Sequence, residues 1–490
     1  MVIVQLADRV GAARAWLVGA LLMTSVGCAS RSAPAPGPEE EWDVYPAPVA
    51  PTPAPVAAPV ATIEAPGPAP VTPDAPLPAP PAPVHAGLSL AELGWPADTR
   101  SVEVTATVHV RRAPGSKAPI AGKVVDGTRA DWHQVIAVVD RCPRWIELAP
   151  QGWVCLDQVA PRAAEPVAIA QPVVTGRSLV PGTYFDVREG GTQAYASAAK
   201  VRAGEVGEEL GSAVMLRSRG EIEIDGVSYQ RTNKGLVPSG DLWALTPSAW
   251  AGIDLRVTPP PSWPFAYALV PGRRGAAIKL RAAPERTAAS AGSVAPRTIV
   301  GYGTERDGYV EVAPGGWALR TELHRVAITA PPPGVGDGEP WIDVDLDEQV
   351  LIAYRGTTPE FATLVSSGIK RGTTPLGTYR VRSMAATTRM IAEPDELKQY
   401  DVGEVPWAIR FRKGLFLHAA YWHDSFGSRH SHGCVNLAPR DARFLYEWAA
   451  LVPDGWSELE LERGRGMVVR VRDAGHPEPP FYGYADETAP

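Results

Sequence analysis

Long apolar runs, an excess of one charge and cysteine are all scarce in this chain of 490 residues. The apolar run from Ala15 to Val26 has twelve residues, whereas a membrane-spanning helix needs roughly 20. The 47 basic and 54 acidic side chains nearly balance, with a net charge of −7, so nothing favours a nucleic-acid partner. Only four cysteines are present, which excludes a small scaffold held together mainly by disulfides.

The N-terminus has the pattern of an export signal. Arg9 and Arg14 supply positive charge beside the apolar run, and Ser25-Val-Gly-Cys28 resembles a bacterial lipobox, although the family prefers Leu where Ser25 stands. The resemblance implies that residues 1–27 are a lipoprotein signal peptide and that Cys28 is lipidated. It also implies an exported, periplasmic protein anchored to a membrane by lipid, with the outer membrane favoured by Ala29. Ordinary cleavage near Ala29 is the alternative.

Proline and glycine divide the rest of the chain into segments. At roughly 100–200 residues per domain, the length predicts three or four domains. Residues 28–97 form a Pro/Ala-rich linker, which cannot build a core and favours extended polyproline conformation. Three small modules follow, at 98–161, 180–247 and 265–327, and the largest domain occupies 339–473. The last stretch, 474–490, is rich in proline and acidic residues and is predicted to be a disordered tail.

The three modules show short alternating apolar stretches punctuated by Gly and Pro, which indicates small β-barrels. The first and third share an Arg-x-x-Pro turn and a late Gly-Trp pair, Gly152-Trp153 and Gly316-Trp317. This pattern resembles bacterial SH3-like domains, which often bind cell-wall peptides. The middle module lacks the turn and the Trp, so a different small β fold is equally open there. Wall binding and an inert spacer role are the two readings of these modules.

The segment with most chemistry lies between His418 and Asn436. Cys434 follows His418 by sixteen residues, inside the run Ser431-His-Gly-Cys-Val-Asn436. A cysteine thiol becomes an efficient nucleophile when a nearby base takes its proton. Glycine before the cysteine allows backbone N–H groups to approach a substrate oxygen. The helix predicted from Pro439 begins too late for its dipole alone to make the thiolate, so an imidazole must supply most of the activation.

This run resembles the active-site signature of L,D-transpeptidases, the YkuD-type cysteine enzymes of peptidoglycan. A second patch, Gly372-Thr-Thr-Pro-Leu-Gly377, resembles the Thr-Pro-x-Gly turn of the same family. The resemblance covers 339–473. It implies a mainly β protein, with a YkuD-type β-sandwich catalytic domain preceded by two or three small SH3-like β-barrels.

Carried over by position, the resemblance assigns the site residues. Cys434 is the nucleophile, His418 its base, and the Ala419 carbonyl orients the histidine ring. The N–H groups of Gly433 and Cys434 form the oxyanion hole. Supporting roles fall to Ser431, His432 and Asn436, whereas Tyr421 and Trp422, with Trp407, are candidates for lining the substrate groove. No cofactor or metal is implied.

The implied reaction is attack on a peptidoglycan tetrapeptide stem. The thiolate attacks the carbonyl before D-Ala, D-Ala leaves, and a thioester remains. An amine of another stem then gives a 3→3 cross-link. Water instead would make the enzyme a carboxypeptidase, and a lysine amine would attach a protein to the wall.

Two other function classes stay open. His430-Ser-His432, with His418, His423 and Asp424 nearby, superficially resembles zinc peptidoglycan peptidases, but those need a His-x6-Asp arm and only five residues separate His418 from Asp424. A wall-binding lipoprotein with a decayed catalytic fold is the other alternative. Retention of the complete signature argues against it.

Two cysteines are left after lipid and catalysis are assigned. Cys142 and Cys155 lie thirteen residues apart within the first module. In an oxidising periplasm they would close a disulfide worth roughly 3 kcal/mol. Two buried free thiols are the alternative, since sequence alone does not fix connectivity. The sequence says nothing about the oligomeric state.

Overall fold

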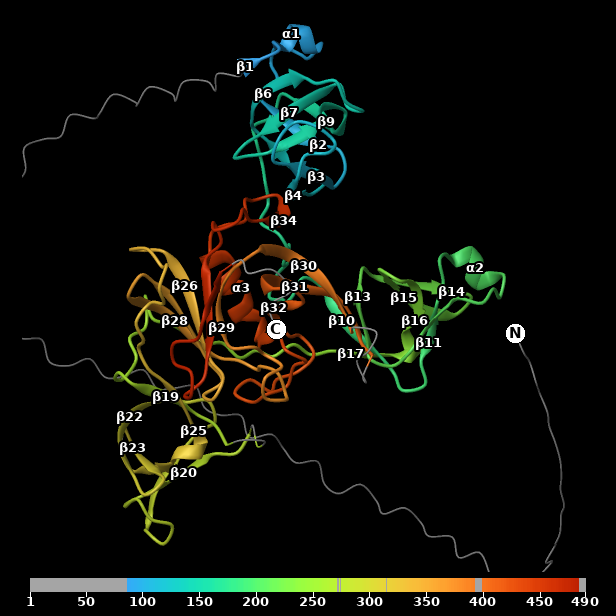
Figure 1. Ribbon diagram of the computed structural model, residues 1–490. Coiled ribbons are helices and arrows are strands. Elements are labelled where there is room, and N and C mark those ends of the chain that lie inside the picture. Colours follow the sequence, from blue (N-terminus) through green and yellow to red (C-terminus); the bar gives the residue numbers. More distant parts are fainter. Residues whose placement is uncertain (1–85, 271–272, 274, 314, 393–398, 484–490) are drawn as a thin grey trace, which may run out of the picture. The chain divides into compact units, whose positions relative to one another are not determined.

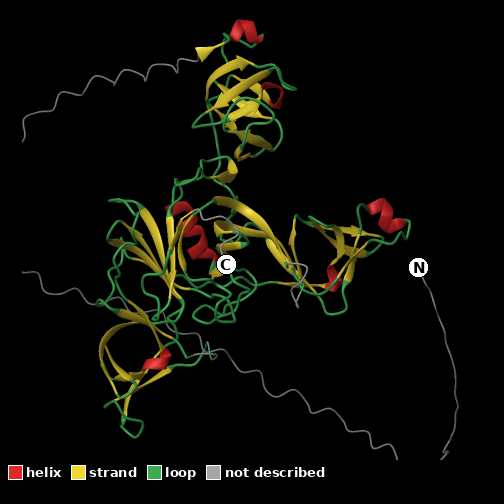
Figure 2. Cartoon of the chain, in the orientation of Figure 1, coloured by secondary structure: helices red, strands yellow, loops and turns green. Residues whose placement is uncertain are grey.

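The computed structural model describes residues 86–483 apart from 271–272, 274, 314 and 393–398. Strands dominate, and the α-helices of this part of the chain are short (Figures 1 and 2), so the mainly β prediction is confirmed. None of the helices within these residues is long and apolar enough to cross a membrane. The predicted signal peptide, Cys28 and most of the Pro/Ala-rich linker lie outside the described residues.

The first module begins earlier than predicted. Ala86 and Gly87 form β1, which pairs with β6, and Ser89 caps a one-turn helix whose Leu93 is buried. Trp95 then packs edge-on against Trp132, with ring centroids 5.9 Å apart. The linker predicted over 28–97 is therefore wrong for 86–97, because its apolar side chains bury against the module. The elements are α1 (Leu90–Leu93), β1 (Ala86–Gly87), β2 (Ser101–Val104), β3 (Val108–Arg111), β4 (Ile120–Val124), β5 (Arg129–Ala130), β6 (Trp132–Ala137), β7 (Arg144–Leu148), β8 (Trp153–Cys155) and β9 (Val159–Arg162).

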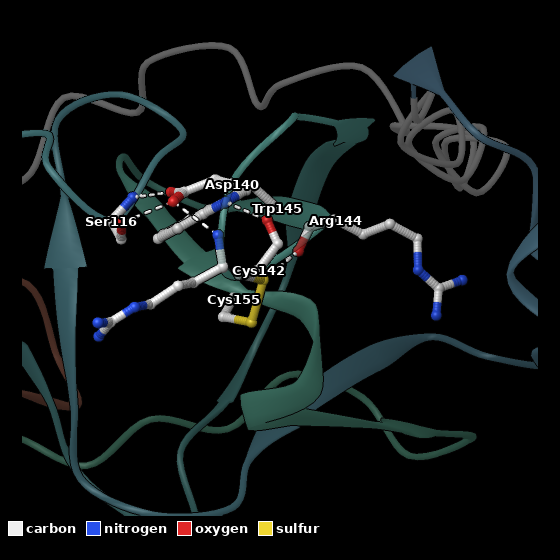
Figure 3. Close-up of a disulfide and its surroundings, with 7 residues drawn as sticks. Ser116, Asp140, Cys142, Arg144, Trp145 and Cys155 are labelled. Carbon is white, nitrogen blue, oxygen red and sulfur yellow. Dashed lines mark hydrogen bonds between the residues drawn. A yellow bond between two sulfur atoms is a disulfide. The ribbon is translucent and has the colours of Figure 1, made fainter.

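A disulfide joins Cys142 to Cys155, as the sequence analysis predicted, and closes the loop between β6 and β8 (Figure 3). Trp145 donates its indole N–H to the Cys142 carbonyl at 3.0 Å. Asp140 accepts the Ser116 hydroxyl at 2.7 Å on the same side of the module. The cross-link limits the freedom of the unfolded segment, which stabilises the folded module.

The second module is a set of short hairpins with a one-turn helix. It extends from Thr183 to Ala244, close to the predicted limits. Its elements are β10 (Thr183–Val187), β11 (Thr192–Ala194), α2 (Ala198–Arg202), β12 (Glu208–Leu210), β13 (Val214–Ser218), β14 (Glu221–Ile224), β15 (Val227–Thr232), β16 (Gly235–Pro238) and β17 (Leu242–Ala244). The following segment contributes β18 (Ile253–Asp254), which pairs with β28 of the domain predicted at 339–473.

The third module is one seven-stranded sheet ordered β21-β20-β24-β23-β22-β19-β25. Its apolar residues alternate inward, as the sequence predicted, and form a separate core around Ala266, Ile278 and Val310. The strands are β19 (Phe265–Ala268), β20 (Ile278–Arg281), β21 (Ser290–Val294), β22 (Ile299–Arg306), β23 (Tyr309–Ala313), β24 (Trp317–Leu319) and β25 (Leu323–Val326). The SH3-like identity of the modules stays a prediction.

The domain predicted at 339–473 has two sheets. The first is ordered β18-β28-β27-β26-β35-β29-β36, and the second contains β34, β30, β31, β32 and β33. One large core joins them, including Ile342 and Val469 of the first sheet, Ile409 and Leu417 of the second, and Leu445 of α3. The elements are β26 (Pro340–Asp345), β27 (Val350–Arg355), β28 (Thr358–Leu364), β29 (Gly377–Arg380), β30 (Ser383–Ile391), β31 (Asp401–Arg412), β32 (Leu415–Ala419), β33 (Val435–Leu437), α3 (Pro439–Trp448), β34 (Trp456–Glu460), β35 (Val468–Arg472) and β36 (Phe481–Gly483).

The chain beyond residue 473 is ordered as far as Gly483, against the prediction of a disordered tail over 474–490. Phe481 begins β36, which adds in parallel to β29. Tyr482 stacks on Tyr379 with ring centroids 5.7 Å apart, and Thr378 donates its N–H to the Pro480 carbonyl at 2.8 Å. Phe481 and Tyr482, two of the three aromatic residues in this Pro-rich segment, were the overlooked signal.

Two modules extend the second catalytic sheet. Strand β4 of the first module pairs with β34, and β13 of the second pairs in parallel with β31. Trp456 and Leu459 of β34 are buried in the first module's own core. These edges of the sheet are thereby covered, and exposed edges invite pairing with other chains.

A buried carboxyl ties helix α3 to the segment before the third module. Asp441 accepts the Gly252 N–H at 2.9 Å and is hydrogen-bonded to the Thr363 hydroxyl. Burial raises the pKa of Asp441 to about 7, because an ionised carboxylate loses its hydration there. The folded protein therefore binds this proton over a pH range in which the unfolded chain releases it.

We expect Asp441 to make the folded protein less stable as pH rises from about 4 to 7. Its contribution is fully present below the unfolded pKa of 3.8 and is lost towards the folded pKa of about 7. The variant Asp441→Asn should remove this slope, of up to about 1.4 kcal/mol per pH unit. Thermal unfolding of both proteins between pH 5 and 8 tests it; parallel profiles would show that the carboxyl is ionised in the folded state.

Candidate active site

The predicted base and nucleophile are brought to neighbouring strands. His418 lies in β32 and Cys434 immediately precedes β33, and the two strands pair in parallel, with His418 opposite Asn436. Residues two apart in a strand share one face, and neighbouring strands lie about 4.8 Å apart. Cys434 lies in the bend that leads into β33, next to Val435, which pairs with Leu417, the neighbour of His418.

His418 is held as a neutral base. Its side chain is buried, and burial lowers its pKa to about 4. Its Nδ1 lies 3.1 Å from the Ala419 carbonyl oxygen, which can only accept, so the ring proton sits on Nδ1. Nε2 then carries the lone pair, as a proton acceptor requires. The predicted orienting role of Ala419 matches this contact.

The loop between the two strands is anchored by the segment that follows β28. Ser366 exchanges both backbone hydrogen bonds with Asn436, and Ser367 accepts the N–H groups of His430 and Ser431. The Gln349 side chain in turn binds the N–H and hydroxyl of Ser367, at 2.9 and 2.7 Å. Backbone hydrogen bonds therefore fix both ends of the cysteine segment.

The Thr-Pro-x-Gly turn supports the residue before the nucleophile. The buried Thr374 hydroxyl accepts the Gly368 N–H and donates to the Gly433 carbonyl, both at 2.8 Å. Gly433 has φ +156°, and a Cβ there would lie 2.7 Å from the Thr373 carbonyl oxygen. Only glycine fits so close to this turn. The sequence predicted this turn, but not its hydrogen bond to Gly433.

The predicted oxyanion hole is only partly compatible with the structure. The Gly433 N–H donates to the Ser431 hydroxyl at 3.1 Å, and that hydroxyl donates to the Cys434 carbonyl at 2.5 Å. The Gly433 N–H is thus engaged inside the loop and does not serve as a preformed donor to substrate. Ser431 instead takes the supporting role predicted for it, and the Cys434 N–H stays a prediction.

His423, which the sequence analysis left outside the signature, contacts it directly. The Ser425 N–H donates to His423 Nδ1 at 3.0 Å, so the neutral ring carries its proton on Nε2. Nε2 lies 2.9 Å from the Asn436 side-chain amide, which must therefore present its oxygen to this N–H. The oxygen and the nitrogen of a side-chain amide have nearly the same shape. With Oδ1 of Asn436 facing His423 Nε2, the histidine N–H has an acceptor.

The three candidate groove aromatics are placed differently. Tyr421 is fully buried, stacked on Tyr184 of the second module at 3.9 Å and bonded to the Gly403 carbonyl at 2.9 Å. It therefore cannot line a groove, contrary to the prediction. Trp407 is buried in the catalytic core. Trp422 is partly exposed and stacks on His418 with ring centroids 5.7 Å apart, so it remains a groove candidate.

The exposed His432 stacks on Tyr400, with ring centroids 4.8 Å apart. Tyr400, just before β31, was missed because it lies far from the cysteine in sequence. His423 and His430 have ring centroids 4.2 Å apart. Among the described residues, no three His, Cys, Asp or Glu side chains are gathered so that they could hold a metal ion. Cys434 is partly exposed, and its sulfur lies 3.8 Å from the Gly414 carbonyl oxygen.

The paired strands, the neutral histidine and the supported Gly-Cys turn all lie within one segment that matches a known family. The model of the YkuD L,D-transpeptidase catalytic domain matches residues 339–471. Residues 339–471 form a YkuD-type L,D-transpeptidase catalytic domain. The limits agree with the predicted 339–473, and the match covers the strands, the helix and the cysteine loop described above.

Comparisons with other proteins add little to this match. No curated protein matches the chain. An L,D-transpeptidase of Stackebrandtia nassauensis is 23% identical over 28% of this chain and 57% of its own, with a TM-score of 0.20. The catalytic domain of the Enterococcus faecium L,D-transpeptidase is 23% identical over 28% and 98%, with a TM-score of 0.22. The chain thus spans little more than half of the Stackebrandtia protein, and such low scores carry no argument of their own.

We expect Thr374→Val to slow acylation of Cys434 roughly tenfold or more. Valine keeps the shape but leaves the buried Gly368 N–H and Gly433 carbonyl unpaired, at a cost of about 1–3 kcal/mol each. Thr374→Ser retains the hydroxyl and is the matched control. Stopped-flow or mass-spectrometric acylation rates would measure the effect. Equal acylation rates for the valine and serine variants would show that the Thr374 hydroxyl does not support the site.

The low pKa of His418 predicts an acid-tolerant acylation rate. Neutral histidine is needed as the base, and with a pKa of about 4 it stays largely neutral at pH 5. An ordinary histidine of pKa about 6.5 would be mostly protonated there. The rate should therefore hold from pH 7 to 5 and fall below about pH 4.5. A midpoint near 6.5 in the pH–rate profile would contradict the buried, neutral assignment.

Proposed function

We propose that this protein is a peptidoglycan L,D-transpeptidase that works through a cysteine thioester. The observation that carries the proposal is the parallel pairing of β32 with β33 within a YkuD-type domain. It supports the proposal because Cys434 directly precedes β33, the neighbour of the strand that carries His418, whose Nε2 bears the lone pair. A base beside a partly exposed thiol is the minimum apparatus for nucleophilic acyl transfer.

The acylation step moves one proton and exchanges one bond. His418 Nε2 takes the thiol proton, and the Cys434 sulfur attacks the carbonyl that precedes D-Ala in a tetrapeptide stem. The C–N bond then breaks, D-Ala leaves as an amine carrying the proton back from His418, and a thioester remains. Burial disfavours a protonated His418, so it weakens the ring as a base towards the thiol and favours return of the proton to the leaving amine.

The second half of the reaction depends on the acceptor. An amine from a neighbouring stem gives a 3→3 cross-link, and this is the proposed product. Water as acceptor would give carboxypeptidase activity, and a lysine side chain would attach a protein to the wall. The residues above serve the acylation half in all three cases, so the acceptor has to be measured.

The proposal includes export and lipid anchoring through Cys28. Support comes from the charged and apolar N-terminus, the Gly27-Cys28 pair and the disulfide between Cys142 and Cys155. Disulfides form and persist in oxidising compartments such as the periplasm. The Pro/Ala-rich segment after Cys28 would then act as a tether between the membrane and the wall.

We expect a carbapenem to form one covalent adduct on Cys434. Intact-protein mass spectrometry should show a single addition to the wild type and none to Cys434→Ala. With tetrapeptide muropeptides, the same instrument should detect release of D-Ala and a dimer joined 3→3. Labelling of Cys434→Ala would overturn the assignment. Stoichiometric zinc in the purified protein, retained in that variant, would favour a zinc peptidase instead.

A further inference from the structure

The catalytic loop is held from outside its own domain. Arg297 of the third module donates Nη1–H to the Asp424 carboxylate and Nη2–H to the Asp424 main-chain carbonyl, both at 2.8 Å. The Ser248 hydroxyl, from the segment before that module, donates to the same carboxylate oxygen at 2.6 Å. Asp424 lies between His418 and Cys434 in the chain. Side chain and backbone of this loop are thus fixed together.

Arg297 occupies a backbone position that disfavours it. Pro296 and Arg297 are the central residues of a turn closed by the Thr298 N–H to the Ala295 carbonyl. Arg297 has φ +63°, and Pro followed by a residue of positive φ is the pattern of a type II turn, where glycine or asparagine is preferred. An arginine there costs conformational energy, which calls for a compensating role of its side chain.

The first module shows the same turn with the preferred residue. Its turn is closed by the Thr128 N–H to the Val125 carbonyl, and Gly127 takes the positive φ, +77°. In both turns the N–H of that residue also bonds to the last residue of a strand, Val104 of β2 or Ala268 of β19. The positions are therefore equivalent. The third module replaces glycine by an arginine that reaches the catalytic loop.

The guanidinium is well enclosed. The Arg297 side chain is 14% exposed, and its charged carbon lies 5.2 Å from the centre of the Trp250 ring. Three groups therefore converge on it, a carboxylate, a carbonyl oxygen and an aromatic face. A planar fork that bonds two oxygens at once fixes orientation as well as distance. Lysine would supply the charge without the second, parallel bond.

Close packing reinforces the clamp a few residues further along. Gly427 has φ +92°, and a Cβ there would lie 2.5 Å from Leu269 of the third module. Its N–H bonds to the Val365 carbonyl at 2.9 Å. The loop is therefore pressed between the third module and the catalytic sheet on both sides of Ser425.

Asp424, the residue that Arg297 holds, is adjacent in the chain to a residue that contacts the Ser431–Asn436 run. His423 precedes Asp424 and bonds to Asn436, and Asn436 is the residue opposite His418 in the strand pair. A shift of Asp424 would move His423, loosen Asn436 and disturb the register that sets the base against the nucleophile. Sub-ångström precision at this point matters because reacting groups must be held in a near-attack geometry.

We infer that Arg297 is a positioning residue for the acylation of Cys434, acting through Asp424 and the His423–Asn436 contact. The third module then contributes a residue that positions the catalytic loop. This inference rests on the proposed function. It adds to that function a residue some 120 positions upstream of the base, which the catalytic-domain signature does not contain.

The variant Arg297→Gly separates positioning from folding. Glycine relieves the positive φ but removes the ion pair with Asp424, so the thermal unfolding temperature should fall only slightly, whereas the rate of carbapenem acylation should fall roughly tenfold or more. Arg297→Lys should recover part of the rate. Arg306→Ala is the matched control, since Arg306 lies in the same module, is exposed, and contacts Asp307 and the Trp317 ring, both within that module.

A double variant tests the path. If Arg297 acts through Asp424, then Arg297→Gly combined with Asp424→Asn should be no slower than the slower single variant. Wild-type rates in Arg297→Gly would overturn the inference. So would a rate loss that comes with partial unfolding at the assay temperature or is matched by Arg306→Ala, because either would assign the effect to folding of the module. Absence of any adduct in the wild type would instead refute the proposed function itself.

Discussion

The parallel pairing of β32 and β33 is the constraint from which the site's geometry follows. Three residue pairs define it, from Leu417 with Val435 to Ala419 with Leu437. Parallel neighbours need a long crossover, usually a helix that packs back onto the sheet. Here the crossover is an irregular loop that carries the chemistry, so it cannot hold its own shape and must be held by neighbours.

Those neighbours come from every side of the loop. The strand end at Ser366 and Ser367 bonds its backbone, the Thr374 hydroxyl fixes the glycine before the nucleophile, and Arg297 grips its middle. Irregular segments that carry function are typically precise only because a rigid scaffold positions them. The burial that makes His418 a neutral base is another product of this enclosure.

The sequence indicated the reacting residues, but not the long-range contacts that hold them in place. A local signal, Pro439, predicted the start of α3. The spacing of His418 and Cys434 indicated a base and a nucleophile, and this assignment stays a prediction, although β32, which carries His418, pairs with β33, which follows Cys434. By contrast, burial of Tyr421 and the grip of Arg297 arise from contacts 237 and 127 residues apart in the chain. No local period encodes such contacts, and likewise the ordered Phe481 depends on β29 being there to receive it.

Strand β34 has a consequence for anyone who would isolate the catalytic unit. Trp456 and Leu459 bury themselves among side chains of residues 93–159 rather than in the sandwich to which their strand belongs. A fragment cut at residue 339 would present that indole and isobutyl group to water, alongside Glu404 and Asp424 stripped of their arginines. Truncation would therefore create a sticky, charge-imbalanced surface, and solubility problems of such a fragment would reflect missing chain rather than a faulty fold.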